Sequence, residues 1–234
     1  MYNEIFKEYP LAVLFAEYCG SETDMIKIER SCAMNFDNAI RGARNPMNSW
    51  AKSDSYYEDG AFVMGEADLA FGKRLVAAGP DHRKFIRQIF VSVDITAPLY
   101  WWKEFDTYKV GTVANSTSTM HKIHSKSFER DDFSHDKMSP AALACLDGII
   151  ACLEEARVQF VETKEKAHWY DMIQLLPSSY NQMRTVTLNY ENLINIYNAR
   201  CSHKLDEWHV LCDWILSLPY AEHLLCPALR GHKE

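Results

Sequence analysis

Hydrophobic and polar residues alternate strictly along residues 89–95. The four aliphatic side chains of this run fall on one side of an extended chain, and a period of two predicts a strand with one buried face. A Thr- and Val-containing run over residues 183–188 and a short apolar run over residues 25–28 predict two further strands.

Apolar residues at a spacing of three and four predict helices along much of the remaining chain. We expect helices over residues 5–18, 35–43, 66–78, 139–166 and 167–176, and a short aromatic helix that begins at Ala97-Pro98. Ser139 and Pro140 supply a capping hydroxyl and a first-turn proline. Residues 48–60 are polar and aromatic and predict a loop, and residues 219–234 predict a loosely packed tail.

The longest helix is predicted to begin at Asn189, the expected N-cap. Its apolar residues recur at helical spacing and form one apolar face, which comprises Leu193, Ile196, Tyr197, Trp208, Leu211, Cys212 and Ile215. At about 100° per residue, Arg200 falls on this face, whereas Asn195 lies well off it. A guanidinium keeps its charge, so Arg200 needs an anion or several acceptors. It either forms a structural ion pair with an Asp or Glu at the edge of the core or lines a binding site.

Length and composition predict a single soluble domain over residues 1–234. The chain has 24% charged and 47% hydrophobic residues and a net charge of −7, which argues against nucleic acid or anionic membrane as a partner. No apolar run approaches the length of a membrane span, and the acidic N-terminal segment does not resemble a signal peptide. We therefore expect a cytoplasmic protein with reduced thiols.

The chain lacks the common motifs of nucleophilic, phosphate-binding and metal chemistry. Neither a Gly-x-Ser-x-Gly elbow nor a phosphate loop occurs, and none of the 7 cysteines forms a Cys-x-x-Cys pair. Cys145 and Cys152 lie seven apart on one helix face, which predicts core positions. His121 and His124 form one weak pair flanked by lysines, so we expect no metal site.

A run of hydroxyl and amide side chains over residues 115–119 is more distinctive. Successive Ser and Thr side chains with backbone N–H groups can bind a phosphate or a carboxylate. A solvated turn or an edge strand is the alternative. Trp101-Trp102 and Tyr108-Lys109 would place flat and cationic groups near such an anion, or else pack in the core with one exposed lysine.

The order Pro177, Thr187, Asn189, Leu193, Asn195 and Arg200 resembles the C-terminal half of the flavin-dependent thymidylate synthases (ThyX family). In that family a proline precedes an Asn-x-x-x-Leu-x-Asn-x-x-x-x-Arg helix. The resemblance covers residues 79–219. It implies an α+β fold, in which a small antiparallel sheet packs with several long helices in a single domain.

The family resemblance implies roles for individual residues. Asn189 and Asn195 match positions that contact flavin, and Arg200 matches the arginine that holds the uracil of dUMP. Glu191 stands where the family usually has an arginine.

The family's upstream signature can be aligned in two registers, and both stay open. An ungapped alignment places Glu104 at a nucleotide-contacting glutamine and residues 107–109 at an Arg-His-Arg triplet, so that Tyr108 and Lys109 would adjoin the flavin. Asn115 then matches a glutamate and Thr117 a serine. A shift of one residue instead matches Asn115 to an asparagine and Ser118 to a serine. In either register, Lys109 is the one cation left in the triplet.

The activity that the resemblance implies is reductive methylation of dUMP, with FAD as cofactor and methylenetetrahydrofolate and NADPH as co-substrates. Arg200 would fix the uracil, Glu104, Asn115, Thr117 and Ser118 would contact the nucleotide, and Asn189, Asn195, Tyr108 and Lys109 would hold FAD. Family members are homotetramers with sites between subunits, so we expect an oligomer. The alternative is a protein of this fold without the chemistry, which binds a nucleotide or a protein partner.

Overall fold

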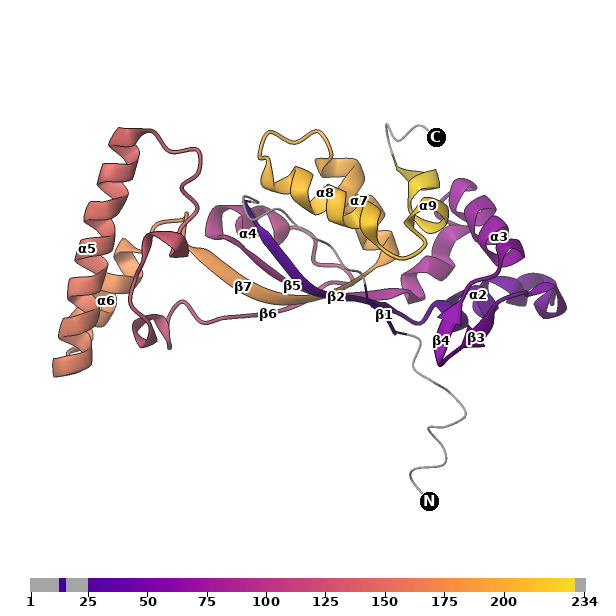
Figure 1. The fold of residues 1–234 in the computed structure, drawn as a ribbon, viewed down its shortest axis with the longest axis horizontal. Coiled ribbons are helices and arrows are strands. Elements are labelled where there is room, and N and C mark those ends of the chain that lie inside the picture. The colour runs from indigo at the N-terminus through magenta and orange to yellow at the C-terminus, as the bar shows by residue number, and fades with distance from the viewer. Residues whose placement is uncertain (1–12, 16–24, 230–234) are drawn as a thin grey trace, which may run out of the picture.

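A computed structural model of the protein describes residues 13–15 and 25–229. Its centre is an antiparallel sheet of five strands in the order β1-β2-β5-β7-β6 (Figure 1). In that order the strands are Val13–Phe15, Lys27–Met34, Phe90–Pro98, Asn181–Asn189 and Val113–Ser116. A separate hairpin pairs β3 (Tyr56–Glu58) with β4 (Ala61–Val63). The strands predicted over residues 89–95 and 183–188 are confirmed as parts of β5 and β7, which pair along their whole length.

One face of the sheet carries the main core. The aliphatic positions of β5 are at most 1% exposed, as the alternation predicts, and Val186 and Leu188 of β7 are buried beside them. The helices α4 (Leu99–Phe105), α7 (Tyr190–Arg200) and α8 (Glu207–Ser217) cover this face (Figure 1). Four tryptophans fill the space between sheet and helices and are fully buried, namely Trp101, Trp102, Trp208 and Trp214. Trp101 and Trp102 are therefore packing residues.

A pair of helices, α5 (Pro140–Thr163) and α6 (Lys166–Leu175), lies at one end of the molecule (Figure 1). Ser139 caps α5 and accepts a hydrogen bond from the Ala142 backbone N–H at 3.3 Å. A second, smaller core holds the pair and includes Ile123, Phe128, Phe133, Leu146, Leu153, Ala156 and Met172. Cys145 and Cys152 are exposed. Their predicted core position is wrong because α5 buries its Leu146 and Leu153 side instead.

The helices α2 (Phe36–Arg44), α3 (Glu66–Ala77) and α9 (Ala221–Leu224) lie toward the opposite end of the molecule (Figure 1). Leu224 and Leu225 are fully buried, so the predicted loosely packed tail is wrong for residues 219–229. Short 3-10 turns complete the chain, at Asn45–Met47, Trp50–Lys52, Arg83–Gln88, Ile123–Ser125, Arg130–Asp132 and Cys226–Ala228. Two of the elements, β3 and the turn at Trp50–Lys52, fall within residues 48–60, where a loop is predicted.

The long helix predicted from Asn189 is two helices. The chain turns over residues 201–206, where the His203 backbone N–H bonds to the Arg200 carbonyl at 2.9 Å. Both α7 and α8 pack on the sheet, so the helical spacing of apolar residues continues across the turn. The sequence pattern therefore does not reveal where α7 ends. Of the helix predicted over residues 5–18, residues 13–15 form a strand, and the others lie outside the described residues. Pro98 ends β5 and is the N-cap of α4, rather than a first-turn residue.

No helix among the described residues is both long and apolar enough to cross a bilayer.

A buried ion pair joins α2 to α3. Arg44 donates from Nε to Asp68 Oδ1 at 2.7 Å, and Ser53 and Ser55 donate to Asp68 Oδ2 at 2.5 and 2.6 Å. Burial raises the pKa of Asp68, but the hydrogen bonds from Ser53, Ser55 and Arg44 and the charge of Arg44 outweigh it, so the pKa lies below its usual value.

We expect Asp68→Asn to lower the free energy of unfolding by about 3 kcal/mol, because it leaves the Arg44 charge buried without a counter-ion. Folding lowers the pKa of Asp68, so its ionised carboxylate contributes to the free energy of unfolding. This contribution is complete above the unfolded-state pKa of about 3.9, and it is lost as the pH falls through the folded-state pKa. Urea unfolding from pH 7 to pH 3 measures both effects. Asp81→Asn, at an exposed position, is the control. Equal pH profiles for wild type and Asp68→Asn would contradict this account.

Candidate functional site

Arg200, the last residue of α7, lies where three helices meet. Its Nη1 donates to Glu104 Oε2 at 2.7 Å, and its Nε donates to the Tyr108 hydroxyl at 2.8 Å. The guanidinium carbon lies 4.5 Å from the ring centroid of Trp208 on α8, which is a cation–π contact. The arginine side chain is 16% exposed. The structure therefore joins α4, the segment after it, α7 and α8 at one charged group.

Glu104 collects donors from the same elements. Its Oε2 also accepts from Trp208 Nε1 at 3.2 Å and lies 3.4 Å from His203 Nε2. The Leu205 backbone N–H donates to His203 Nδ1 at 3.2 Å, so Nδ1 is the acceptor and Nε2 carries the proton toward Glu104. Within the described residues, Glu104 Oε1 and Arg200 Nη2 have no hydrogen-bond partner. The structural ion pair predicted as one alternative for Arg200 is thus present, and an acceptor and a donor remain beside it.

A capping box fixes the start of α7. The Asn189 side chain accepts from the Asn192 backbone N–H at 3.0 Å, and Asn192 Oδ1 accepts from the Asn189 N–H at 3.1 Å, which confirms the predicted N-cap. Asn192 Nδ2 also donates to the Val110 carbonyl at 2.7 Å. Gly111 has φ +75°, and a Cβ there would lie 3.0 Å from Asn192 Oδ1. These contacts hold the segment that carries Tyr108 against α7.

Asn192 and Gly111 are thus positioning residues that the sequence patterns did not single out. An asparagine three residues after an N-cap is the signal that could have found Asn192. Asn195 is exposed on α7, and Lys109 is exposed on the segment after α4.

The run over residues 115–119 forms the end of the edge strand β6 and a turn. Thr117 donates to the Met183 carbonyl from both its N–H, at 2.9 Å, and its hydroxyl, at 3.3 Å. Ser118 Oγ accepts from the backbone N–H groups of Met120 and His121 at 3.2 and 2.8 Å. Asn115, Thr117 and Ser118 are exposed, and none of their hydrogen bonds reaches Arg200. The structure thus brings Glu104, Tyr108 and Arg200 together. Asn115, Thr117 and Ser118 lie apart from them at the sheet edge.

Glu191 has a structural partner. Its carboxylate accepts two hydrogen bonds from Arg83 Nε at 3.2 and 3.0 Å and one from Nη2 at 2.9 Å, and the two side chains are 12% and 13% exposed. The pair anchors the first turn of α7 to the 3-10 turn Arg83–Gln88. The acidic residue therefore belongs to the scaffold of this helix.

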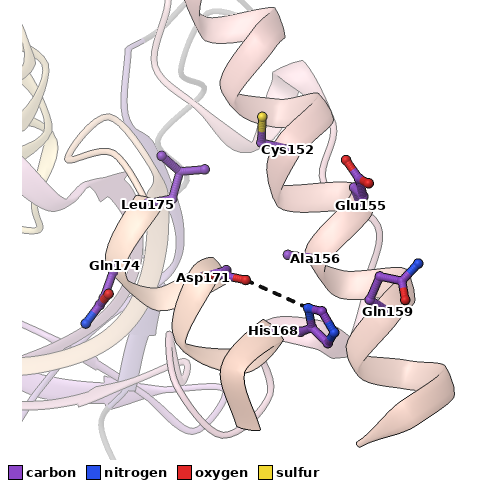
Figure 2. A pocket seen from close by; sticks show the side chains of 8 residues that line it. All are labelled: Cys152, Glu155, Ala156, Gln159, His168, Asp171, Gln174 and Leu175. Atoms are coloured by element: carbon purple, nitrogen blue, oxygen red, sulfur yellow. Dashed lines mark ion pairs between the residues drawn. The ribbon is translucent and has the colours of Figure 1, made fainter. Parts of the chain in front are cut away.

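A cavity of about 580 Å³ lies between α5 and α6 (Figure 2). His168 lies 3.8 Å from Asp171, while Cys152 points away from this pair, so the cavity shows no thiol–imidazole dyad. A second cavity, of about 450 Å³, is lined by Arg30, Cys32, Ser92, Asp94 and Thr185 of the sheet. Neither cavity is lined by Arg200, Asn189 or Asn195. No group of three or more His, Cys, Asp or Glu side chains within the described ranges could hold a metal ion.

Comparisons with known proteins identify the fold. No protein-family model and no curated protein matches the chain. A thymidylate synthase X (ThyX) of Helicobacter pylori, crystallised with FAD and dUMP, is 18% identical with a TM-score of 0.64 over 88% of this chain and 99% of that chain. A UMP/dUMP methylase, PolB, of Streptomyces cacaoi, bound with 5-Br dUMP, is 13% identical with a TM-score of 0.56 over 86% and 92%. The predicted α+β fold of the flavin-dependent thymidylate synthases is confirmed.

We expect Glu191→Arg to lower the free energy of unfolding by about 3 kcal/mol, because it places two guanidinium groups together in a largely buried position. The double variant Arg83→Glu/Glu191→Arg should recover most of this loss, because it restores an opposite-charge pair. Urea unfolding of the two single variants and the double variant gives the coupling energy. Additive losses in the double variant would show that the pair does not anchor α7.

Proposed function

We propose that this chain is a cytoplasmic FAD-dependent methyltransferase of the thymidylate synthase type, which carries out reductive methylation of dUMP with methylenetetrahydrofolate and NADPH. The observation that carries the proposal is Arg200. It is a partly exposed guanidinium between two aromatic rings, on a fold shared with proteins crystallised with FAD and dUMP.

Arg200 and Glu104 together suit the imide edge of a uracil ring. Arg200 Nη2 can donate to a ring carbonyl, and Glu104 Oε1 can accept the ring N–H, while the bonds from Arg200 to Glu104 and Tyr108 stay intact. Arg200 keeps both N–H groups of Nη2 and one of Nη1 for a ligand, because its bonds to Tyr108 and Glu104 use only Nε–H and one N–H of Nη1. The ring of Tyr108 or Trp208 offers a flat surface beside the arginine.

The residues that the resemblance assigns to FAD fit a flavin in part. Asn195 and Lys109 are exposed and available, whereas Asn189 caps α7 and the Tyr108 hydroxyl accepts from Arg200. When bound, FAD supplies the redox chemistry, and the protein binds and orients the pyrimidine. Asn115, Thr117 and Ser118 lie on a sheet edge and would meet the nucleotide phosphate of another subunit more readily than that of their own.

We therefore propose a homo-oligomer, a tetramer as the resemblance implies, with each site completed by a second copy. Arg200 lines neither the cavity between α5 and α6 nor the one on the sheet, and a second copy would supply the walls that enclose a flavin beside it. On the face of the sheet opposite the main core, Phe90 is 42% exposed and Ser92 and Asp94 are half-buried, which offers room for a neighbour. Light scattering at micromolar protein should give a mass of about four chains, because the site needs surfaces from several subunits. A stable monomer that still turned over dUMP would contradict this arrangement.

A second candidate function is nucleotide or protein binding without catalysis. One observation favours it. Glu104 already partly neutralises Arg200, and Lys109 is the one cation of the segment 107–109, so the site has little positive charge for a flavin and a phosphate. Under this alternative dUMP binds in the same place, and no methylated product forms.

We expect Arg200→Lys to weaken dUMP binding at least about tenfold, because lysine keeps the charge but loses the free Nη2 donor in its fixed plane. Arg184→Lys is a matched control. Arg184 is also 16% exposed, pairs with Asp106 at 2.7 Å, and lies 4.3 Å from the Trp102 ring centroid. Titration calorimetry with dUMP measures both variants.

Turnover is tested by mass spectrometry of the nucleotide after incubation with FAD, methylenetetrahydrofolate and NADPH. A 5-methylated product supports the enzyme, and dUMP binding without product supports the second candidate. If the Arg200→Lys and Arg184→Lys variants bound dUMP with equal affinity, Arg200 would not be a dUMP-binding residue under either candidate function.

A further inference from the structure

A third cavity, of about 270 Å³, lies between the N-terminal end of α4, residues 134–138 and the loop that joins α7 to α8. Polar side chains line much of it, among them Tyr100, His135, Ser179, Lys204 and Glu207. It shares no side chain with the Arg200 cluster. No part of the proposed function uses it.

Glu207 is a buried carboxylate without a counter-ion in the described part of the chain. Its residue is 4% exposed, and its Oε1 accepts a hydrogen bond from the Tyr100 hydroxyl. Burial, followed by the hydrogen bond to Glu207, raises the pKa of Tyr100 well above its usual value, so Tyr100 stays a neutral donor. Among the described residues, no cationic side chain lies within ion-pair distance of Glu207, and Oε2 has no hydrogen-bond partner. Buried carboxylates are normally paired with a cation, so this one calls for a positive partner.

Two further acceptors line the same cavity. His135 Nδ1 lies 2.8 Å from the Phe133 carbonyl and therefore carries a proton, so that in the neutral imidazole Nε2 is the acceptor. Ser179 is 8% exposed, and its hydroxyl has no hydrogen-bond partner within the described part of the chain. Glu207, His135 and Ser179 therefore each bring to one cavity an acceptor that has no hydrogen-bond partner in the described part of the chain and that a ligand or water can use.

The charged side chains that line this cavity favour a cationic ligand that also carries an anionic group. The lining contains three carboxylates, from Asp136, Asp206 and Glu207, and two ammonium groups, from Lys137 and Lys204. Lys137 lies 3.4 Å from Asp206, and Lys204 is exposed at the cavity without an ion pair to a described residue. A carboxylate on the ligand could therefore meet Lys204.

We propose that this cavity binds a small molecule with a primary ammonium group, whose N–H donors meet Glu207 Oε2, His135 Nε2 and the Ser179 hydroxyl. An ammonium group has three donors and a positive charge, which match the three acceptors and the unpaired carboxylate. The volume limits the ligand to about the size of an amino acid. A simple amine and a zwitterion share this chemistry, and Lys204 distinguishes them.

Titration calorimetry of the full chain with propylamine, glycine and propionate tests the proposal. We expect both ammonium compounds to bind and propionate, which lacks the ammonium, not to bind. Glu207→Gln should weaken ammonium binding at least about tenfold, because it removes the charge but keeps the shape. Glu162→Gln, at an exposed position of α5, is the matched control and should leave the affinity unchanged.

Two further variants sharpen the test. Lys204→Ala should weaken glycine and leave propylamine unchanged, which would identify the natural ligand as a zwitterion. If Glu207→Gln fails to fold by circular dichroism, Ser179→Ala replaces it and should weaken both ammonium compounds several-fold. The proposal is overturned if neither ammonium compound binds at millimolar concentration, or if the folded Glu207 or Ser179 variant binds them as tightly as the wild type does.

Discussion

The ion pair between Arg200 and Glu104 is the constraint around which the helical layer is arranged. A guanidinium that is 16% exposed must find acceptors, and it finds them on α4 and on the segment after it. Trp208 on α8 packs against the guanidinium and donates to the same carboxylate. The fold therefore delivers one donor and one acceptor, side by side, next to aromatic rings. This arrangement suits the pyrimidine base of the proposed function.

The scaffold around this pair makes its position rigid. The capping box of Asn189 and Asn192 and the bidentate contact between Glu191 and Arg83 fix the first turn of α7. Gly111 allows the segment that carries Tyr108 to approach that turn closely. Glu191, which stands where the family that the chain resembles has an arginine, is thus part of the scaffold of α7. The charge that the family places there is absent from this site.

The sequence was most informative where one physical pattern acted alone. The alternation in β5 and the cap at Asn189 were predicted correctly, because each depends on local chemistry. The turn between α7 and α8 was not predicted, since the apolar phase from Leu193 to Ile215 continues across it. The partners of Arg200 and Glu191 were also missed, because Glu104 and Arg83 are about a hundred residues away along the chain and nothing local marks them. The resemblance identified the fold, and it assigned Glu104 to the nucleotide and Tyr108 to the flavin but not to the contacts with Arg200 that the structure shows.

The central claim is that this fold still holds a flavin beside Arg200. The most direct measurement is a titration of the purified protein with FAD, followed by the visible absorption band of the flavin, with dUMP then added. The account predicts that the protein takes up FAD and that dUMP perturbs the band, because under the proposed function the nucleotide would lie against the flavin. A protein that takes up no FAD, with or without dUMP, would contradict it.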